Sequence, residues 1–338
     1  MFKDVLNELI AGNDLTQTEV TVLMNHIMSG NATDAQIGAF LMGLRMKGES
    51  VQEVYSAAGV MRRHATFVDA GARSVVDTCG TGGDGSQTFN ISTTTAFVAS
   101  GAGVCVAKHG NRAVTSKCGS ADVLAELGFN LDADPFVMEQ CIQEHGIGFL
   151  FAPHMHPAMK NVGGPRKQLG IRTVFNMLGP LTNPAGATGQ VLGVFSPELT
   201  EMFAEALKNL GCRRAYVVHG EDGLDEMTCT GITRVSELRD GVVKTYEVSA
   251  DMLLGEAYSL EDLVGGEPPR NAEILRGVLD GSIKDAPRAA VLLNSAAAIV
   301  VGEQADTLEQ GLDLAEKSID SGAALEKLET LIRESRAA

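Results

Sequence analysis

The first 65 residues repeat apolar and polar positions with the period of an α-helix. Helices are expected to begin at three capping boxes, in which a Ser or Thr and a Glu or Gln three positions later satisfy each other's backbone N–H groups. These boxes lie at residues 16–19, 33–36 and 50–53, and apolar side chains recur on one face of the segment that follows each. The pattern predicts a small all-helical domain over residues 1–72.

From about residue 74 onward, short apolar runs alternate with helical segments. This alternation predicts an α/β domain over residues 73–338, with a mainly parallel central sheet flanked by helices on both faces. A hairpin broken at Asp240 and Gly241 is expected to extend the sheet, and helices to finish the chain. The clearest segments are the strands at 74–77, 104–107, 147–151 and 215–218, and the helices at 93–100, 120–127, 197–210 and 288–301.

The stretch from Pro153 to Pro184 differs from the rest of the chain. It is rich in proline and glycine, and it holds four basic residues and no acid, namely Lys160, Arg166, Lys167 and Arg172. We interpret it as a crossing between the domains that lies beside an anion site, with part of residues 160–185 belonging to the small domain.

Composition narrows the function. A formal net charge of -16 argues against general affinity for nucleic acid, which depends on neutralising phosphates with Lys and Arg. A polyphosphate substrate would need local cations or a metal to approach this chain. The N-terminus has acids within its apolar pattern, and the six cysteines include no C-x-x-C pair. These features predict a cytoplasmic protein with free thiols.

A glycine-rich loop follows the first expected strand. Gly80, Gly82 and Gly85 satisfy G-x-G-x-x-G, the fingerprint of a dinucleotide site. That fingerprint also requires an acid about 20 residues further on, and residues 85–121 contain neither Asp nor Glu. We therefore reject a dinucleotide site. The loop leads instead to Asn-Ile-Ser-Thr at 90–93, where a helix N-terminus predicts phosphate binding. The alternative is a tight turn with an ordinary Asn or Ser cap.

Two further polar clusters follow expected strands. Residues 108–112 read Lys-His-Gly-Asn-Arg, and residues 220–226 read Gly-Glu-Asp-Gly-Leu-Asp-Glu. Because α/β sheets bind ligands at the carboxyl ends of their strands, both are candidate site loops. Adjacent carboxylates also suit Mg²⁺. Taken alone, the first cluster is typical of a solvated basic loop and the second of a simple turn. His154 and His156 have no third ligand for a transition metal, so we expect them near a ligand instead.

In this order the pieces resemble the anthranilate phosphoribosyltransferase family over nearly the whole chain. The most specific segments are Gly-Pro-Arg-Lys-Gln-Leu-Gly-Ile-Arg-Thr at 164–173 and Asn-Met-Leu-Gly-Pro-Leu-Thr-Asn-Pro at 176–184. The resemblance implies a fold shared with pyrimidine nucleoside phosphorylases, two Mg²⁺ ions per active site, and a homodimer formed through the N-terminal helices. The implied substrates are anthranilate and 5-phosphoribosyl 1-diphosphate (PRPP), as in tryptophan biosynthesis.

The resemblance also implies roles for individual residues. Lys108, Arg166, Asp225 and Glu226 would be catalytic, and Ser92, Asp225 and Glu226 would bind the metal. Anthranilate would be bound by Gly80, His109, Asn111, His154 and Arg166. PRPP would be held by Gly80, Gly82, Gly83, Asp84, Thr88, Asn90, Ser92, Thr93, Lys108 and Ser120.

One position departs from the family pattern. Cys118 stands where many relatives have serine. A backbone contact there would survive this change, whereas a hydroxyl contact to diphosphate would be weakened.

Two alternative functions remain open at this stage. A nucleoside phosphorylase would use a similar glycine loop and lysine, but the acidic pair and the segment around Arg166 favour the transferase. A non-catalytic relative that binds nucleic acid would be basic and would have lost motif residues, which this acidic chain has kept.

Overall fold

Four helices form the N-terminal part of the computed structural model, which describes residues 2–71, 74–113, 116–256 and 258–337. They are α1 (Phe2–Ile10), α2 (Gln17–Met28), α3 (Asp34–Lys47) and α4 (Val51–Arg63). The three capping boxes are all present with both reciprocal hydrogen bonds, which confirms the predicted helix starts. The domain boundary expected at 72–73 falls outside the described residues.

A seven-stranded sheet follows, in the order β3-β2-β1-β4-β5-β6-β7. The first five strands in this order are parallel, and β6 and β7 are added as an antiparallel hairpin. The predicted fold class is therefore confirmed, but the sequence analysis missed β4, which lies at the centre. The strands are β1 (Val76–Gly80), β2 (Val106–Gly110), β3 (Ile147–Phe151), β4 (Gly189–Gly193), β5 (Arg214–Gly220), β6 (Ile232–Arg239) and β7 (Val242–Ser249).

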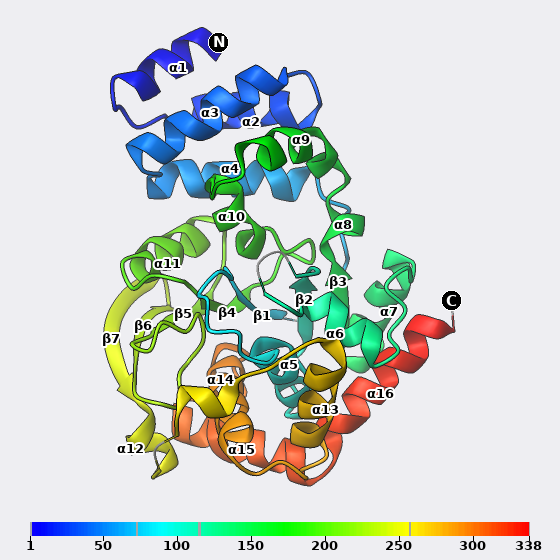
Figure 1. The fold of residues 1–338 in the computed structure, drawn as a ribbon. Coiled ribbons are helices and arrows are strands. Elements are labelled where there is room, and N and C mark those ends of the chain that lie inside the picture. The colour runs from blue at the N-terminus through cyan, green and yellow to red at the C-terminus, as the bar shows by residue number, and fades with distance from the viewer. Residues whose placement is uncertain (1, 72–73, 114–115, 257, 338) are drawn as a thin grey trace.

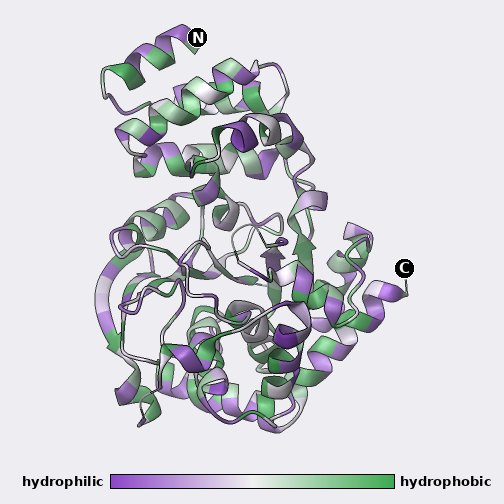
Figure 2. Cartoon of the chain, in the orientation of Figure 1, coloured by the Kyte–Doolittle hydropathy of each residue, from purple (hydrophilic) through white to green (hydrophobic). Residues whose placement is uncertain are grey.

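Helices cover both faces of the sheet (Figure 1). α5 and α14 pack against the central strands, whereas α11 packs against β5 and β6 and also contacts α4 of the N-terminal domain. Figure 2 shows hydrophobic and hydrophilic residues mixed on the helices of both domains, as expected for helices with one buried face. Besides α14 (Ala286–Val301), the helices are α5 (Ile91–Gly101), α6 (Ser120–Glu126), α7 (Pro135–His145), α11 (Leu199–Asn209), α12 (Ala250–Leu254), α13 (Pro268–Leu279), α15 (Leu308–Asp320) and α16 (Ala323–Arg336).

The two faces of the sheet belong to two different hydrophobic cores. In β4, Val191 lies in the core formed with α5 and α14, whereas its neighbour Leu192 lies in the core of the N-terminal helices. Val218 and Val217 of β5 are divided in the same way. Successive strand residues point to opposite faces, so this alternation places the N-terminal helices and one face of the sheet in one continuous core.

The segment between the domains is mostly helical, although it is rich in proline and glycine. It forms α8 (Ala152–Met155), α9 (Lys160–Leu169) and α10 (Val174–Leu178). α9 packs against α2 and α3, and α10 packs against α3 and α4, as seen beside the N-terminal helices in Figure 1. Within the described part of the chain, no helix has the length and apolar character needed to span a membrane.

A buried carboxylate ties the N-terminal helices together. Glu53, whose side chain is 0% exposed, accepts hydrogen bonds from the backbone N–H groups of Leu15 (2.9 Å) and Ser50 (2.8 Å) and pairs with Lys47 (2.9 Å). Glu53→Ala should therefore lower the free energy of unfolding by about 3 kcal/mol, since it leaves Lys47 and two N–H groups without this partner. Chemical denaturation measures the loss.

Glu19 offers a matched control, because it occupies the same position in the capping box of α2 but is only partly buried. Glu19→Ala should cost only about 1 kcal/mol. Equal losses in the two variants would show that burial of Glu53 contributes nothing.

Candidate active site

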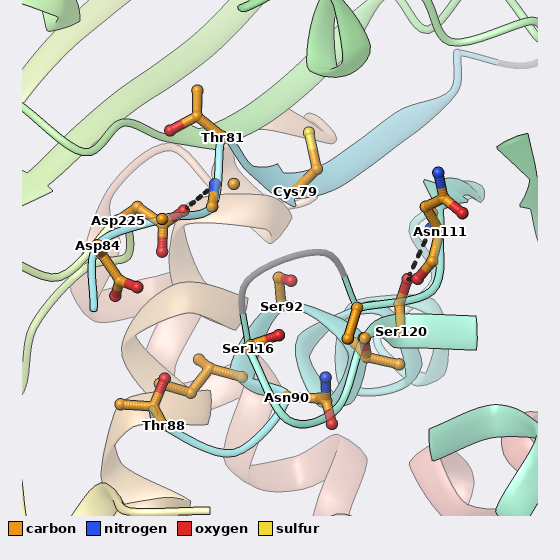
Figure 3. Close-up of a pocket in the computed structure, with 18 of the residues that line it drawn as sticks. Cys79, Thr81, Asp84, Thr88, Asn90, Ser92, Asn111, Ser116, Ser120 and Asp225 are labelled. Carbon is orange, nitrogen blue, oxygen red and sulfur yellow. Dashed lines mark hydrogen bonds between the residues drawn. The ribbon is translucent and has the colours of Figure 1, made fainter. Parts of the chain in front are cut away.

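A cavity of about 510 Å³ lies at the carboxyl ends of the parallel strands. Its walls come from the loops that follow β1, β2 and β5, and from Phe195 just after β4. Arg166, Arg172 and Asn176 of the inter-domain segment complete the lining. Figure 3 shows side chains from these separate loops pointing into one space. The cavity thus lies where the sheet meets the segment that connects the two domains.

The cavity brings together nearly all the residues that the sequence singled out. Those that line it are Gly80, Gly82, Gly83, Asp84, Thr88, Asn90, Ser92, Thr93, Lys108, His109, Asn111, Ser120, Arg166, Asp225 and Glu226.

His154 does not line the cavity, contrary to expectation. It lies on α8 with its ring 5.2 Å from that of Phe151 and its Nε2 3.7 Å from Asp132. His156, the residue that ends this helical turn, instead lies against the cavity residue His109, with ring centroids 5.0 Å apart. Two residues on a helical turn point in different directions, which is why only one of these histidines reaches this region.

The glycine loop and the acidic pair are joined by direct hydrogen bonds. Asp225 Oδ2 accepts the N–H of Gly82 at 2.7 Å, and Glu226 Oε1 accepts the N–H of Ser92 at 3.1 Å. The first of these bonds is drawn in Figure 3. The two loops follow β1 and β5, which β4 separates in the sheet. They therefore meet over the end of β4.

Glycine is required at two strand ends for this meeting. A Cβ on Gly193 would lie 1.4 Å from the backbone oxygen of Asp225, and one on Gly80 would lie 2.3 Å from its Oδ2. Neither position leaves room for a side chain, because real Cβ atoms never approach other atoms so closely. The acidic loop can fold over the sheet only because both strands end in glycine.

Asn90 does not act as an ordinary helix cap. It precedes α5, but its side chain makes no capping hydrogen bond. Its Nδ2 donates to the backbone oxygen of Cys118 at 3.1 Å, and its Oδ1 accepts from Asn271 at 2.9 Å. The cysteine thus contributes a backbone contact, which does not depend on its side chain. Burial raises the pKa of the Cys118 thiol to about 11, so the thiol stays protonated near neutral pH.

Lys108 is the buried cation of the site, with only 4% of its surface exposed. Its Nζ donates to the carbonyl of Thr78 and to Ser92 Oγ at 3.3 Å. Burial lowers its pKa, while the nearby charges of Asp77 and Glu226 act in the opposite direction. Ser92 thus lies between the lysine and the acidic pair.

Both carboxylates of the acidic pair have raised pKa values, because nearby positive charge does not offset their burial and the repulsion from neighbouring carboxylates. Burial raises the pKa of Asp225 to about 7, helped by the charge of Asp84. Burial likewise raises the pKa of Glu226 to about 8, helped by Asp225 and opposed by Lys108. Buried carboxylates in this state favour a cation. Among the described residues, no group of three or more His, Cys, Asp or Glu could hold a metal alone. The residues therefore fit Mg²⁺, which binds through one or two carboxylates together with substrate oxygens.

Two arginines from the inter-domain segment also line the cavity. Arg166 stacks over the ring of Phe175 at 5.3 Å, and no described carboxylate pairs with it. Arg172 stacks over Phe195 at 4.4 Å and donates to the carbonyl of Gly83. The sequence analysis assigns Arg172 no role beyond its place in a basic run. Its contact with the glycine loop is visible only in three dimensions.

The histidine side of the cavity is neutral. Burial lowers the pKa of His109 to about 3, with His156 acting in the same direction, and burial lowers the pKa of His156 to about 4. The Nε2 atoms of both rings are buried and have no hydrogen-bond partner in the described structure. His109, which lines the cavity with His156 packed behind it, can thus contact a bound ring without adding charge.

Comparison with known proteins defines the class first. A family model described as "Glycosyl transferase family, helical bundle domain" matches residues 3–65, and one described as "Glycosyl transferase family, a/b domain" matches residues 72–325. Together they span most of the chain, so its architecture is that of a two-domain glycosyltransferase.

The more specific relatives agree with one another. A protein of Desulfosudis oleivorans named anthranilate phosphoribosyltransferase is 57% identical over 98% of both chains. The structure of the Thermus thermophilus enzyme of that name has a TM-score of 0.93 and 41% identity, covering 98% of this chain and 99% of that one. The Saccharomyces cerevisiae enzyme in complex with PRPP and Mg has a TM-score of 0.91 and 30% identity, covering 100% of this chain and 98% of that one. The chain belongs to the anthranilate phosphoribosyltransferase family.

The raised pKa of Glu226 makes a testable demand on stability. Between pH 4.5, the ordinary pKa of a glutamate, and about pH 8, Glu226 in the folded chain keeps a proton that it has released in the unfolded chain. The free energy of unfolding should therefore fall as the pH rises through this range. Glu226→Gln cannot lose a proton, so in EDTA it should melt at a higher temperature than the parent at about pH 8.5, with the difference shrinking towards about pH 5.

Glu201→Gln is the control, because Glu201 is an exposed residue of α11. It should leave the pH dependence of melting unchanged. If Glu226→Gln melts no higher than the parent at the alkaline end, burial does not raise this pKa.

Proposed function

We propose that this protein transfers the phosphoribosyl group of PRPP to the amine of anthranilate, giving N-(5-phosphoribosyl)anthranilate and diphosphate in tryptophan biosynthesis. The observation that carries the proposal is a single cavity lined by two chemically different sets of residues. A glycine loop, a buried lysine and an acidic pair form one set, and an arginine with no described carboxylate partner is the other. The first suits a metal-bound diphosphate and the second an aromatic carboxylate.

The donor is held by backbone and hydroxyl groups at the start of α5. Gly80, Gly82 and Gly83 let the loop approach a diphosphate closely, and Ser92 and Thr93 lie in the first turn of the helix. Lys108 lies beside Ser92 and would stabilise the charge that develops on the departing diphosphate. Asp84, Thr88, Asn90 and Ser120 complete the donor contacts that we propose.

Magnesium would bind beside Ser92, through Asp225 and Glu226, and we propose two ions per active site. When bound, the metal would neutralise charge on the diphosphate oxygens. The carboxylates are fixed in place by the N–H groups of Gly82 and Ser92. They therefore need little reorganisation to receive a cation.

Anthranilate would bind beside Arg166. The planar guanidinium of Arg166 matches a carboxylate in two-point contact, and its stacking on Phe175 fixes its plane. Gly80, His109 and Asn111 line the same cavity and would contact the ring and amine. We add His156, which lies against His109, in place of His154.

The reaction needs no strong general base in this arrangement. An aromatic amine is neutral near pH 7, so its lone pair is free to attack C1 of the ribose while the C1–O bond to diphosphate breaks, with inversion at that carbon. The nitrogen then loses one proton to the departing diphosphate or to water. The neutral state of His109 agrees with this, since the group has little affinity for a proton. The protein mainly holds amine and sugar in line and stabilises the leaving group.

Three further features belong to the proposal. We infer a homodimer formed through the N-terminal helices, a cytoplasmic location and no binding of nucleic acid. The net charge of -16 supports the last of these.

The assignment of Arg166 can be tested by substitution. Arg166→Lys keeps the charge but loses the planar fork, so the KM for anthranilate should rise about tenfold while that for PRPP changes little. Steady-state kinetics that follow anthranilate fluorescence measure both constants. Lys167→Ala, at an exposed neighbour on α9, should leave both unchanged. A selective loss on the PRPP side would contradict the assignment.

The need for a metal can be tested by chelation. One opposite charge at contact distance contributes about 4 kcal/mol at a dielectric constant of about 20, so exhaustive chelation should slow turnover about a thousandfold. The Asp225→Asn variant should need about tenfold more Mg²⁺ than the parent to reach its maximal activity. Full activity without any divalent ion would refute the metal site.

The rival function has its own test. Release of a nucleobase from thymidine or uridine would indicate a phosphorylase.

A further inference from the structure

Residues 263–265, just before α13, pack from outside the cavity against the loop that joins β1 to α5 (residues 81–90). We call this loop the donor loop and these contacts the bracket. The N–H of Phe89 donates to the carbonyl of Leu263 at 3.0 Å, and the N–H of Gly265 donates to the carbonyl of Gln87 at 3.0 Å. Thr88 and Val264 form an antiparallel bridge between these bonds. The loop that we assign to PRPP is therefore held along its outer edge by residues about 175 positions further along the chain.

The backbones of the two segments approach closely at this bracket. A Cβ on Gly265 would lie 2.7 Å from both the backbone N and the Cα of Phe89. A glycine is therefore needed for the contact to form. A close, glycine-dependent contact of this kind fixes the loop more firmly than a surface hydrogen bond would.

Asn271 completes the bracket with two side-chain hydrogen bonds. It lies in the first turn of α13 and is only 1% exposed. Its Oδ1 accepts the N–H of Gly266 at 2.7 Å, and its Nδ2 donates to Asn90 Oδ1 at 2.9 Å. The first bond ties Asn271 to its own segment, and the second reaches the end of the donor loop.

The bond to Asn90 determines which way that amide faces. An amide side chain has a donor on one side and an acceptor on the other, so a partner that donates selects the oxygen. With its oxygen held by Asn271, Asn90 directs its Nδ2 to the carbonyl of Cys118 at 3.1 Å. Three segments that are distant in sequence thus meet at one amide: the donor loop, the loop before α6 and the start of α13.

Asn271 does not line the cavity in the described structure, whereas Asn90 and Cys118 do. We propose that Asn271 is a positioning residue for the sugar donor, which acts through the amide of Asn90 to hold the two donor-side loops in register. The proposal rests on the proposed function, since it presumes that these loops bind PRPP.

The experiment is a double-mutant cycle on donor binding. Binding of PRPP with Mg²⁺, without anthranilate, is measured by calorimetry for the parent, Asn271→Ala, Asn90→Ala and the double variant. Loss of one directing hydrogen bond should weaken PRPP binding about tenfold. Because Asn271 acts through Asn90, the double variant should bind no more weakly than Asn90→Ala alone. The KM for anthranilate should stay near the parent value in Asn271→Ala.

Two further variants separate positioning from folding. Asn271→Asp keeps the acceptor for Gly266 but lacks the amide donor, so at about pH 8 it should weaken PRPP binding as Asn271→Ala does. Ser335→Ala removes an equally buried side chain that bonds to Asn130 away from the cavity, and it should lower stability without changing PRPP affinity.

The outcomes distinguish this proposal from the function on which it rests. Parent protein that fails to form product from anthranilate and PRPP overturns the proposed function. An active parent with normal PRPP affinity in both Asn271 variants overturns the role of Asn271. Losses that multiply in the double variant also overturn it, because they would show that Asn271 acts independently of Asn90.

Discussion

The site depends on two adjacent carboxylates, the half-buried Asp225 and the buried Glu226. They belong to the loop after β5, but they accept the backbone N–H groups of Gly82 in the loop after β1 and of Ser92 in the first turn of α5. Burial of like charges is unfavourable, and it appears here as raised pKa values. The two N–H groups fix the carboxylates in place, and under the proposed function these carboxylates would receive a cation with its bound diphosphate.

The order of the strands and the glycines at their ends allow the acidic pair to reach the loop after β1. The loops after β1 and β5 can touch only by passing over β4, and Gly80 and Gly193 remove the side chains that would prevent it. Outside the cavity, Gly265 serves the same purpose where a second segment presses against Phe89. The donor loop therefore has close contacts at two places. The contact at Gly80 and Gly193 makes room for Asp225, and the contact at Gly265 fixes the loop at Phe89.

Local chemistry explains what could be predicted from the sequence. Capping boxes, apolar runs and polar clusters after strands act within a few residues, so the helix starts, most strands and the site loops were visible. β4 is missed because glycine stands at both of its ends and only two apolar residues, Val191 and Leu192, lie between them. The contacts of Arg172 and Asn271 depend on tertiary structure, which leaves no periodic signal. The resemblance implies His154, and the sequence alone does not favour either histidine, because spacing cannot show which side of a single helical turn faces inward.

The shared hydrophobic core links the segment that carries Arg166 to the central strands of the sheet. Val162 of α9 and Phe175 of α10 lie in the same core as Leu192 and Val217 of the sheet. The element that carries Arg166 is thus anchored to the strands whose ends carry the donor loops. Close-packed interiors resist compression and transmit strain, so a change within this core would be felt at both ends of it. A methylene lost beneath the sheet would therefore shift Arg166 relative to the loops after β1 and β5 without touching either of them.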